Sequence, residues 1–317
     1  MFEAPTVSAV IPAYNTRNCV CVAIDSALAQ EGVSVEVIVV DDCSQDGTAD
    51  HVAATYAGDP RVVILRRQVN GGPSAARNIG FEAARGNWIG ILDSDDTWQP
   101  DRLQRLLSYQ QEADFIADNI LGYDVVAGVA TGPIYHDHAD GPLYLVDFLQ
   151  PKAADKHDLG YLQPLLRRSF LVEHNLRYHT DVRVGEDLLF NLEFLACGGR
   201  AYYVDEPLYV YAMPVGVISR AASPHSRSTV NTGPLALALG DLWKRLQEGL
   251  TPEENQAFAH RLRALKRGAS IAAFHRARAK SDFAEMARLF AREPAVREKI
   301  IQRITGGYLP SRLRAGG

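Results

Sequence analysis

The sequence has few cysteines and no long apolar run. Its four cysteines, among 317 residues, include no Cys-x-x-Cys pair, which argues against a structural zinc site and favours free thiols in a reducing compartment. No stretch reaches the ~18 uninterrupted apolar residues of a membrane-spanning helix. The N-terminus also lacks the basic and apolar segments of a secretory signal. We therefore expect a cytoplasmic protein, either soluble or peripheral to a membrane.

Two common phosphate-binding signatures are also missing. There is no Walker lysine, and no Gly-x-Gly-x-x-Gly follows the first expected strand, so P-loop and nicotinamide-dependent enzymes are excluded. The formal charge of −5 is close to neutral but unevenly distributed. Residues 241–317 hold 16 Lys and Arg against 8 Asp and Glu, whereas residues 1–240 hold 17 against 30. An acidic body thus precedes a basic tail, and this asymmetry bears on binding partners.

Strands and helices alternate along the first hundred residues. The apolar, β-branched segments favour strands, and the segments between them have helical spacing. This order is typical of right-handed βαβ units, so it predicts an α/β fold with an open, mostly parallel sheet. The expected strands are residues 7–11, 33–40, 62–65 and 88–92, and the expected helices are residues 19–29, 48–57 and 75–84.

The rest of the chain is less regular. Helices are expected at 101–112 and 187–197, and strands at 115–120 and 201–211. Residues 235–304 are rich in helix formers, with expected N-caps at Thr251 and Ser281.

Polar side chains follow every expected strand of the parallel sheet. Carboxyl ends of parallel strands meet at one edge, where ligands bind. Turn chemistry and helix capping are the favoured explanation for Asp46–Thr48, because these residues introduce a helix. They do not explain three carboxylates at Asp93, Asp95 and Asp96, because these repel one another unless a cation neutralises them. Mg²⁺ or Mn²⁺, held by one or two protein oxygens and by substrate phosphates, meets that need.

Four motifs together resemble a known family. Their order and spacing are similar to those of the inverting family 2 glycosyltransferases of the GT-A fold, and the similarity covers about residues 5–215. The motifs are VIPAYN at 10–15, VVDDCSQDGT at 39–48, NGGPSAARNIG at 70–80 and ILDSDD at 91–96. The segment GEDLLF at 185–190 resembles the acceptor-side motif of that family. Residues 158–178 and 218–220 resemble bacterial, succinoglycan-type members that build exopolysaccharide repeat units on a lipid carrier.

The resemblance implies a GT-A, Rossmann-like sheet with donor-binding residues along its edge. Pro12 and Tyr14 would line the base pocket, and Asn15 is counted with the donor-binding residues. Asp42 would accept a hydrogen bond from uracil N3–H, whereas Asp41 is assigned a structural role. Arg77 would lie near the nucleotide or its phosphates, although an exposed helix arginine is the alternative.

The fourth motif would hold the ribose, the metal and the sugar. Asp93 would contact the ribose, and Asp95 would ligate the metal, with Asp93 as the second candidate ligand. Asp96 would face the sugar, and Ser94 is counted with the donor-binding residues.

The acceptor side requires a base. Inversion needs a group that takes the proton of the attacking hydroxyl, and the resemblance assigns this role to Asp187, with Glu186 orienting it or the acceptor. The same two acids also suit the start of a helix, where the dipole favours negative charge, and the two interpretations are compatible. We expect no large pKa shift at Asp187, because a base must be ionised at neutral pH.

These expectations define two domains. Residues 1–225 would form the GT-A domain, with the nucleotide-sugar half at 1–100 and the acceptor half at 101–225, and residues 226–317 a helical, basic extension. The extension is interpreted either as a subdomain with a solvated basic face or as a surface that lies on anionic lipid. Nucleic acid is not an expected partner, because the body is acidic. Arg220 or His225 is a candidate lid over the diphosphate.

The expected activity is metal-dependent sugar transfer. A hexose such as glucose would pass from a UDP-sugar to a hydroxyl of a growing, lipid-linked saccharide of a bacterial cell-surface polysaccharide, at the cytoplasmic face of the inner membrane. Two rivals stay open. A sugar nucleotidyltransferase would need a basic, Gly-rich loop after the first strand, where this chain has AYNTRN. A catalytically inactive sugar-nucleotide or glycan-binding module would not need Asp93, Asp95 and Asp187.

Overall fold

The computed structural model describes residues 5–150, 157–213 and 230–304. The chain forms two compact units, Met1–Arg220 and Ala221–Gly317. The expected boundary at 225/226 and the lid candidates Arg220 and His225 lie outside the described residues, so they stay predictions.

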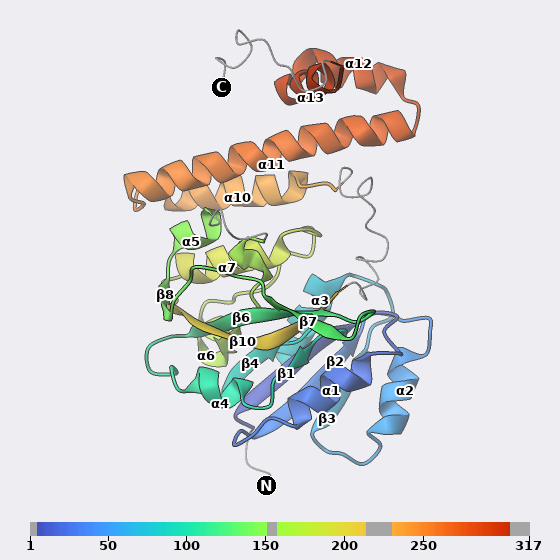
Figure 1. Cartoon of the computed structure of the whole chain (residues 1–317), viewed down its shortest axis with the longest axis vertical. Coiled ribbons are helices and arrows are strands. Elements are labelled where there is room, and N and C mark those ends of the chain that lie inside the picture. Colours follow the sequence, from blue (N-terminus) through green and yellow to red (C-terminus); the bar gives the residue numbers. More distant parts are fainter. Residues whose placement is uncertain (1–4, 151–156, 214–229, 305–317) are drawn as a thin grey trace. The chain divides into compact units, whose positions relative to one another are not determined.

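A ten-stranded sheet forms the centre of the N-terminal unit (Figure 1). Its strand order is β3-β2-β1-β4-β9-β6-β10-β5, with β7 beside β6 and β8 beside β10. The strands are β1 (Val7–Ala13), β2 (Val35–Asp41), β3 (Val62–Arg66), β4 (Trp88–Ile91), β5 (Thr97–Trp98), β6 (Phe115–Asp124), β7 (Val129–Pro133), β8 (Gly141–Leu143), β9 (Leu165–Arg167) and β10 (Ala201–Met213).

Helices connect and cover these strands. They are α1 (Val20–Leu28), α2 (Thr48–Thr55), α3 (Pro73–Ala83), α4 (Arg102–Leu107), α5 (Leu145–Leu149), α6 (Arg168–Glu173) and α7 (Glu186–Ala196), with a 3₁₀ turn η1 at Leu159–Tyr161. The expected helix at 101–112 was too long, because after Leu107 the backbone continues in i→i−3 turns.

The parallel half of the sheet has its switch point between β1 and β4. Strand β1 pairs in parallel with both β2 and β4, and β2 pairs in parallel with β3. The chain therefore steps outward from β1 to β3 and then returns to the other side of β1. Right-handed crossovers consequently place α1 and α2 on one face and α3 on the opposite face. Open α/β sheets bind ligands at such a switch point, outside the carboxyl ends of the strands.

Close packing brings α3 to this edge. Gly80 of α3 lies against Val10 of β1, and a Cβ at Gly80 would collide with the valine side chain. The close approach keeps the residues of α3 near the ends of β1 and β4. Arg77 stands one helical turn before Gly80, so the same packing fixes its position.

The other half of the sheet is mixed and rests on a buried ion pair. Strand β10 runs parallel to β6 and antiparallel to β5, and β9 is antiparallel to both β4 and β6. Arg102 of α4 is fully buried, pairs with Asp118 of β6 at 2.6 Å, and lies over the rings of Trp98 and Tyr209. These contacts anchor β5 and β10, and Tyr209 then reaches the turn after β4.

The C-terminal unit consists of helices over its described residues. These are α10 (Gly233–Leu246), α11 (Pro252–Ala279), α12 (Phe283–Arg292) and α13 (Pro294–Ile304). The expected N-cap at Thr251 is confirmed, and Glu254 completes a capping box with it. The expected cap at Ser281 was wrong, because Asp282 accepts the N-terminal bond of α12, from the Glu285 amide. None of the described helices is both long and apolar enough to cross a membrane.

Candidate active site

The carboxyl end of β2 holds Asp42 in a cradle of donors. Its carboxylate accepts from the backbone N–H groups of Gly71 and Gly72, the latter at 2.6 Å, and pairs with Arg67. Gly72 has a φ of +83°, and the Arg183 side chain lies where its Cβ would be, so no other residue fits there without rearrangement. Several acceptor sites of Asp42 are thus engaged by the protein itself, and its expected contact with uracil stays a prediction.

The loop after β1 presents Tyr14 at the same edge. Pro12 pairs in register with Val40 of β2, and Tyr14 just beyond it is 39% exposed. Asn15 has a φ of +53°, and its side-chain oxygen accepts from the Gln45 amide at 2.8 Å. Asn15 therefore ties the loops after β1 and β2 together and leaves the Tyr14 ring accessible. The contact of these residues with a base stays a prediction.

The acidic turn after β4 alternates between open and buried positions. Asp93 and Asp95 are partly exposed, whereas Ser94 and Asp96 are buried. The turn is closed by a hydrogen bond from the Asp96 amide to the Asp93 carbonyl at 3.1 Å. The exposed pair, Asp93 and Asp95, is therefore the part of the turn that can meet a ligand.

Asp96 does not face a sugar, and that expectation was wrong. The residue is 2% exposed, and its two oxygens accept from the Tyr209 hydroxyl at 2.7 Å and the Ala212 amide at 2.8 Å. Burial, together with the nearby charges of Asp93 and Asp95, raises the pKa of Asp96 well above its ordinary range. The Tyr209 hydroxyl also accepts from the Asp93 amide at 3.2 Å. Asp96 and Tyr209 thus fix the shape of the turn from inside.

Arg77 joins the acidic turn to the acceptor-side motif. Its guanidinium, 3% exposed, lies 2.8 Å from the Asp93 carboxylate, 2.9 Å from Asp187 and 3.8 Å from Glu186. The exposed-arginine alternative is therefore wrong. One buried cation holds carboxylates from two motifs that lie about ninety residues apart, and this pairing brings Asp93, Glu186 and Asp187 into one cluster.

Helix α7 begins inside this cluster. Gly185 at its N-cap has a φ of +73°, and Glu186 and Asp187 form the first turn. Glu186 and Asp187 therefore start a helix, and this position is compatible with the proposed role of Asp187 as the base. A helix terminus gives both carboxylates a rigid mount.

Tyr178 holds Asp187 from the other side. The Tyr178 hydroxyl hydrogen-bonds the Asp187 carboxylate, and Arg77 lies over the Tyr178 ring at 5.2 Å. The Tyr178 backbone is in turn fixed by the Asn78 side chain, which accepts from its N–H at 2.8 Å and donates to its carbonyl at 2.9 Å. The Tyr178 ring stacks on Phe190 of α7 at 4.4 Å. Asp187 thus has a defined orientation.

The electrostatics of the cluster shift the pKa of Asp187. Burial raises it most, Glu186 and Asp93 raise it further, and Arg77 and the Tyr178 hydrogen bond oppose the rise, so the pKa reaches about 7. The expectation of no large shift was therefore wrong. Near neutral pH this carboxylate exists in both protonation states, which suits proton transfer.

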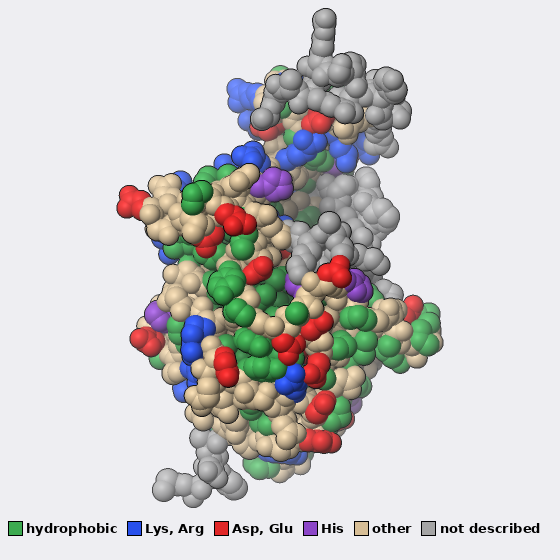
Figure 2. Space-filling view, turned by 60° about the vertical axis from the view of Figure 1, so that its left-hand side comes forward, with side chains coloured by type: hydrophobic (Ala, Val, Ile, Leu, Met, Phe, Trp, Pro, Cys, Tyr) green, Lys and Arg blue, Asp and Glu red, His purple; other side chains and the backbone are tan. Residues whose placement is uncertain are grey.

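The negative charge of the cluster also bears on cation binding. Over the described residues, no three His, Cys, Asp or Glu side chains gather into a group that would hold a metal by themselves. Asp93 and Asp95, on the open side of the turn, match instead the sparse carboxylate set that Mg²⁺ uses when substrate phosphates complete its shell. In the view of Figure 2, several Asp and Glu side chains lie on the surface of the N-terminal unit.

Sequence reasoning missed several residues that build the site. Asn78 stands beside Arg77 in the third motif, and Tyr178 closes the segment that resembles lipid-linked transferases, yet neither was given a role. Tyr209 and Arg183 belonged to no motif. The position of Asn78 next to Arg77 could have indicated a role for Asn78. The contacts of the acidic turn with β10 join residues up to 116 positions apart, so no local sequence pattern predicts them.

Comparison with known structures identifies the class of fold. The crystal structure of residues 1–349 of S. aureus TarS in complex with UDP-GlcNAc superposes with a TM-score of 0.62 at 15% identity, over 96% of this chain and 93% of that one. The mannosyltransferase PcManGT of Pyrobaculum calidifontis, in complex with GDP-Man and Mn²⁺, gives 0.57 at 18% identity, over 95% and 85%. The fold is therefore of the GT-A type, as predicted, and its sheet combines parallel and antiparallel pairs.

Sequence comparison then identifies the family. The profile of Glycosyl transferase family 2 matches residues 8–156. TuaG of Bacillus subtilis, named for teichuronic acid biosynthesis, is 31% identical over 68% of this chain and 82% of its own length. The chain belongs to glycosyl transferase family 2.

Other similar proteins are named for exopolysaccharide synthesis. The succinoglycan biosynthesis protein ExoO of Rhizobium meliloti is 41% identical over 69% of this chain, and ExoU of the same organism is 38% identical over 62%. The chain spans 64% of the length of ExoO and 59% of that of ExoU.

Proposed function

We propose that this chain is a metal-dependent inverting glycosyltransferase of bacterial cell-surface polysaccharide synthesis. It moves a hexose, such as glucose, from a UDP-sugar to a hydroxyl of a growing, lipid-linked saccharide. The observation that carries the proposal is the Arg77 bridge, which sets a carboxylate with a pKa of about 7 beside the acidic turn after β4. The biosynthetic setting is supported by the names of ExoO, ExoU and TuaG.

The residues of this chain divide the work of the reaction. Tyr14 and Asp42, at the ends of β1 and β2, hold the nucleotide, and Asp93 contacts its ribose. Asp187 accepts the proton of the attacking hydroxyl, and Glu186 orients that hydroxyl. Arg77 keeps Asp187 at a fixed distance from the donor side, so attack and proton removal occur in one geometry.

A divalent cation completes this site. Asp95, with Asp93, would hold Mg²⁺ or Mn²⁺ on the open side of the turn, and the ion would neutralise charge on the departing UDP. The surplus of carboxylates over Arg77 in this cluster supports the assignment. The basic C-terminal unit is proposed to lie on anionic lipid at the cytoplasmic face of the inner membrane, where a lipid-linked acceptor is presented.

A donor screen tests the proposal directly. UDP-hexoses with Mn²⁺ or Mg²⁺ are expected to raise the melting temperature and to release UDP slowly by hydrolysis, with GDP-sugars giving smaller effects. Melting temperature and UDP release are measured for each sugar nucleotide with and without metal. Stabilisation without any UDP release, even with saccharide acceptors, would instead favour a binding module, and no response to any UDP-sugar would contradict the proposal.

The pH dependence of transfer tests the base assignment. Because the pKa of Asp187 is raised to about 7 before a cation binds, the ionised, active form is lost as pH falls through that value when the metal is kept below saturation. Below it, kcat/KM is expected to fall by about tenfold per pH unit. Tyr178→Phe removes a hydrogen bond that lowers this pKa, so its acid limb should move to higher pH.

The control for this profile is Tyr161→Phe, which changes an exposed tyrosine of the same unit. Profiles of both variants and of the unmodified protein are recorded from about pH 5 to 9. A purely structural role for Tyr178 would lower activity at every pH without moving the limb, and that result would contradict the orientation argument.

A further inference from the structure

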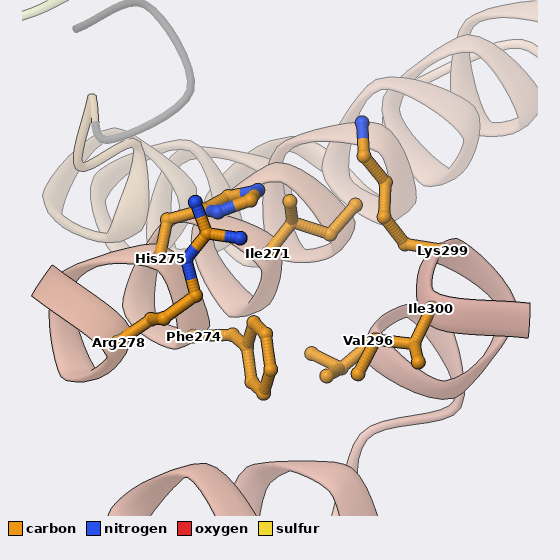
Figure 3. A pocket seen from close by; sticks show the side chains of 7 residues that line it. All are labelled: Ile271, Phe274, His275, Arg278, Val296, Lys299 and Ile300. Atoms are coloured by element: carbon orange, nitrogen blue, oxygen red, sulfur yellow. The ribbon is translucent and has the colours of Figure 1, made fainter. Parts of the chain in front are cut away.

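A pocket lies between α11 and α13 of the C-terminal unit. Its volume is about 250 Å³, and its walls are mostly apolar. Figure 3 shows Phe274 of α11 facing Val296 and Ile300 of α13 across it, with Ile271 of α11 behind them. The volume lies close to the ~300 Å³ lower bound of ordinary ligand sites and exceeds the ~150 Å³ of an apolar cavity that accommodates benzene.

Two cations border this apolar space. Arg278 of α11 and Lys299 of α13 line the pocket and are exposed, and neither forms an ion pair with a described residue. The neighbouring acids are engaged elsewhere, since Glu298 pairs with Arg267 at 2.8 Å and Glu293 accepts from the Ser270 hydroxyl at 2.7 Å. The pocket thus combines an apolar interior with a positive rim, which is the complement of an amphiphile with an anionic head.

The chain's own C-terminal segment is the other candidate occupant. Residues 305–317 contain Arg312 and Arg314 and no acidic residue. A segment with two positive charges is repelled by a rim that carries Arg278 and Lys299. Charge complementarity therefore favours an anionic ligand over this segment.

A second apolar feature lies on α12, the helix that follows α11 and precedes α13 in the sequence. Phe283 and Phe290 of α12 are 75% and 41% exposed, and α12 has no buried residue. They stand seven residues apart, so they share one face of the helix. Arg292 belongs to the same short element, whereas Arg288 pairs with Glu285 at 2.6 Å. Apolar and basic side chains thus recur together in this unit, as on surfaces that meet lipid. Figure 2 shows Lys and Arg side chains on its described helices.

We propose that the α11–α13 pocket binds the aliphatic chain of a phosphate-headed membrane amphiphile, with Arg278 and Lys299 contacting the phosphate. The apolar walls bury part of the chain, and the two cations give charge-assisted hydrogen bonds to the head. This site rests on the proposed membrane contact of the C-terminal unit and not on sugar transfer, so either can fail alone.

The test uses decyl phosphate as a monomer and the full chain in calorimetry. Decyl phosphate is expected to bind about tenfold tighter than either inorganic phosphate or uncharged decyl glucoside, because each of these lacks one half of the ligand. If inorganic phosphate binds as tightly as decyl phosphate, the apolar pocket contributes nothing to binding. If decyl glucoside binds as tightly as decyl phosphate, Arg278 and Lys299 contribute nothing. No binding to the full chain, as when residues 305–317 fill the pocket, would also overturn the proposal.

Two matched double variants distinguish the effect of the two rim cations on affinity from the effect of the overall positive charge. Arg278→Gln with Lys299→Gln is expected to weaken decyl phosphate by about tenfold or more. Arg263→Gln with Lys266→Gln removes the same charge from exposed positions on α11 outside the pocket and should change affinity by less than about twofold. Equal losses in both variants would overturn the site.

A third variant tests the apolar interior. Ile300→Trp fills the pocket and should abolish decyl phosphate binding, while the UDP-dependent rise in melting temperature persists. Retained binding in Ile300→Trp would contradict occupation of the pocket. If UDP does not raise the melting temperature of the unmodified protein, that result contradicts the proposed sugar transfer but not the proposed lipid site.

Discussion

Replacing Asp187 by asparagine is expected to abolish sugar transfer while donor binding is retained. The side chain keeps its shape and can still contact Arg77 and Tyr178, but an amide cannot accept the proton of the acceptor hydroxyl. Positioned bases contribute about 10²–10⁴-fold to rate, so kcat/KM should fall by that amount. UDP release with acceptor measures the loss, and calorimetry with UDP and Mn²⁺ measures donor affinity.

Stability separates this loss from unfolding. Because the pKa of Asp187 is raised from 3.8 to about 7, its ionisation disfavours the folded state, and this cost grows as pH rises from about 4 to 7 and then persists. Asp187→Asn removes that cost, so its melting temperature at pH 8 should equal or exceed that of the unmodified protein. Glu173→Gln, which changes an exposed carboxylate at the end of α6 outside the cluster, is the matched control and should retain the rate of the unmodified protein. Wild-type turnover in Asp187→Asn would show that another group is the base.

The parallel half of the fold was predictable because its signals are local. Strand β2 is buried along its whole length, and its apolar sequence indicates this directly. Asp42, Asp93 and Asp95 fall at strand ends for the same reason, since a parallel sheet brings carboxyl ends to one edge. The Thr251 capping box was likewise readable from four consecutive residues.

The burial of the site could not be predicted in this way. Arg77 is buried because it pairs with Asp93 and Asp187, which lie sixteen and 110 residues away in the sequence. The helical spacing around Arg77 gives no information about either contact. Asp96 looks like Asp95 in the sequence, but Tyr209, 113 residues on, takes its carboxylate inward. The pKa of Asp187 follows from the same contacts, so a value expected near its ordinary range was wrong.

Charge balance connects the proposed metal binding by Asp93 and Asp95 with the proposed proton transfer by Asp187. A single buried guanidinium faces Asp93, Glu186 and Asp187, and a buried charge network of this kind is stable when its surplus charge is compensated. Protonation of Asp187 is one compensation, since the group has a pKa of about 7. A divalent cation at Asp95 and Asp93 would be another, and it would return Asp187 to the ionised form that removes a proton. Metal binding should therefore favour both donor binding and the active state of the base.

Asp95→Ala is accordingly expected to remove metal-dependent UDP binding and turnover together. Electrostatic assistance by a bound metal is worth several kcal/mol, so a loss of about 10²–10³-fold in kcat/KM is expected at fixed Mn²⁺. Its fold should persist, because Asp95 is partly exposed while Asp96 fixes the turn from inside. Calorimetric titration of UDP with and without Mn²⁺ measures the binding, and UDP release with acceptor measures the rate.

Two neighbours of Asp95 make the result specific. Asp101→Ala removes an exposed carboxylate that makes no capping bond at the start of α4, and it should leave UDP binding and turnover unchanged. Asp96→Ala breaks the contacts with Tyr209 and Ala212, so it should lower the melting temperature before any ligand is added. If Asp95→Ala binds UDP and Mn²⁺ with the affinity of the unmodified protein, Asp95 does not hold the cation. The charge of the turn would then have to be balanced through Arg77 alone.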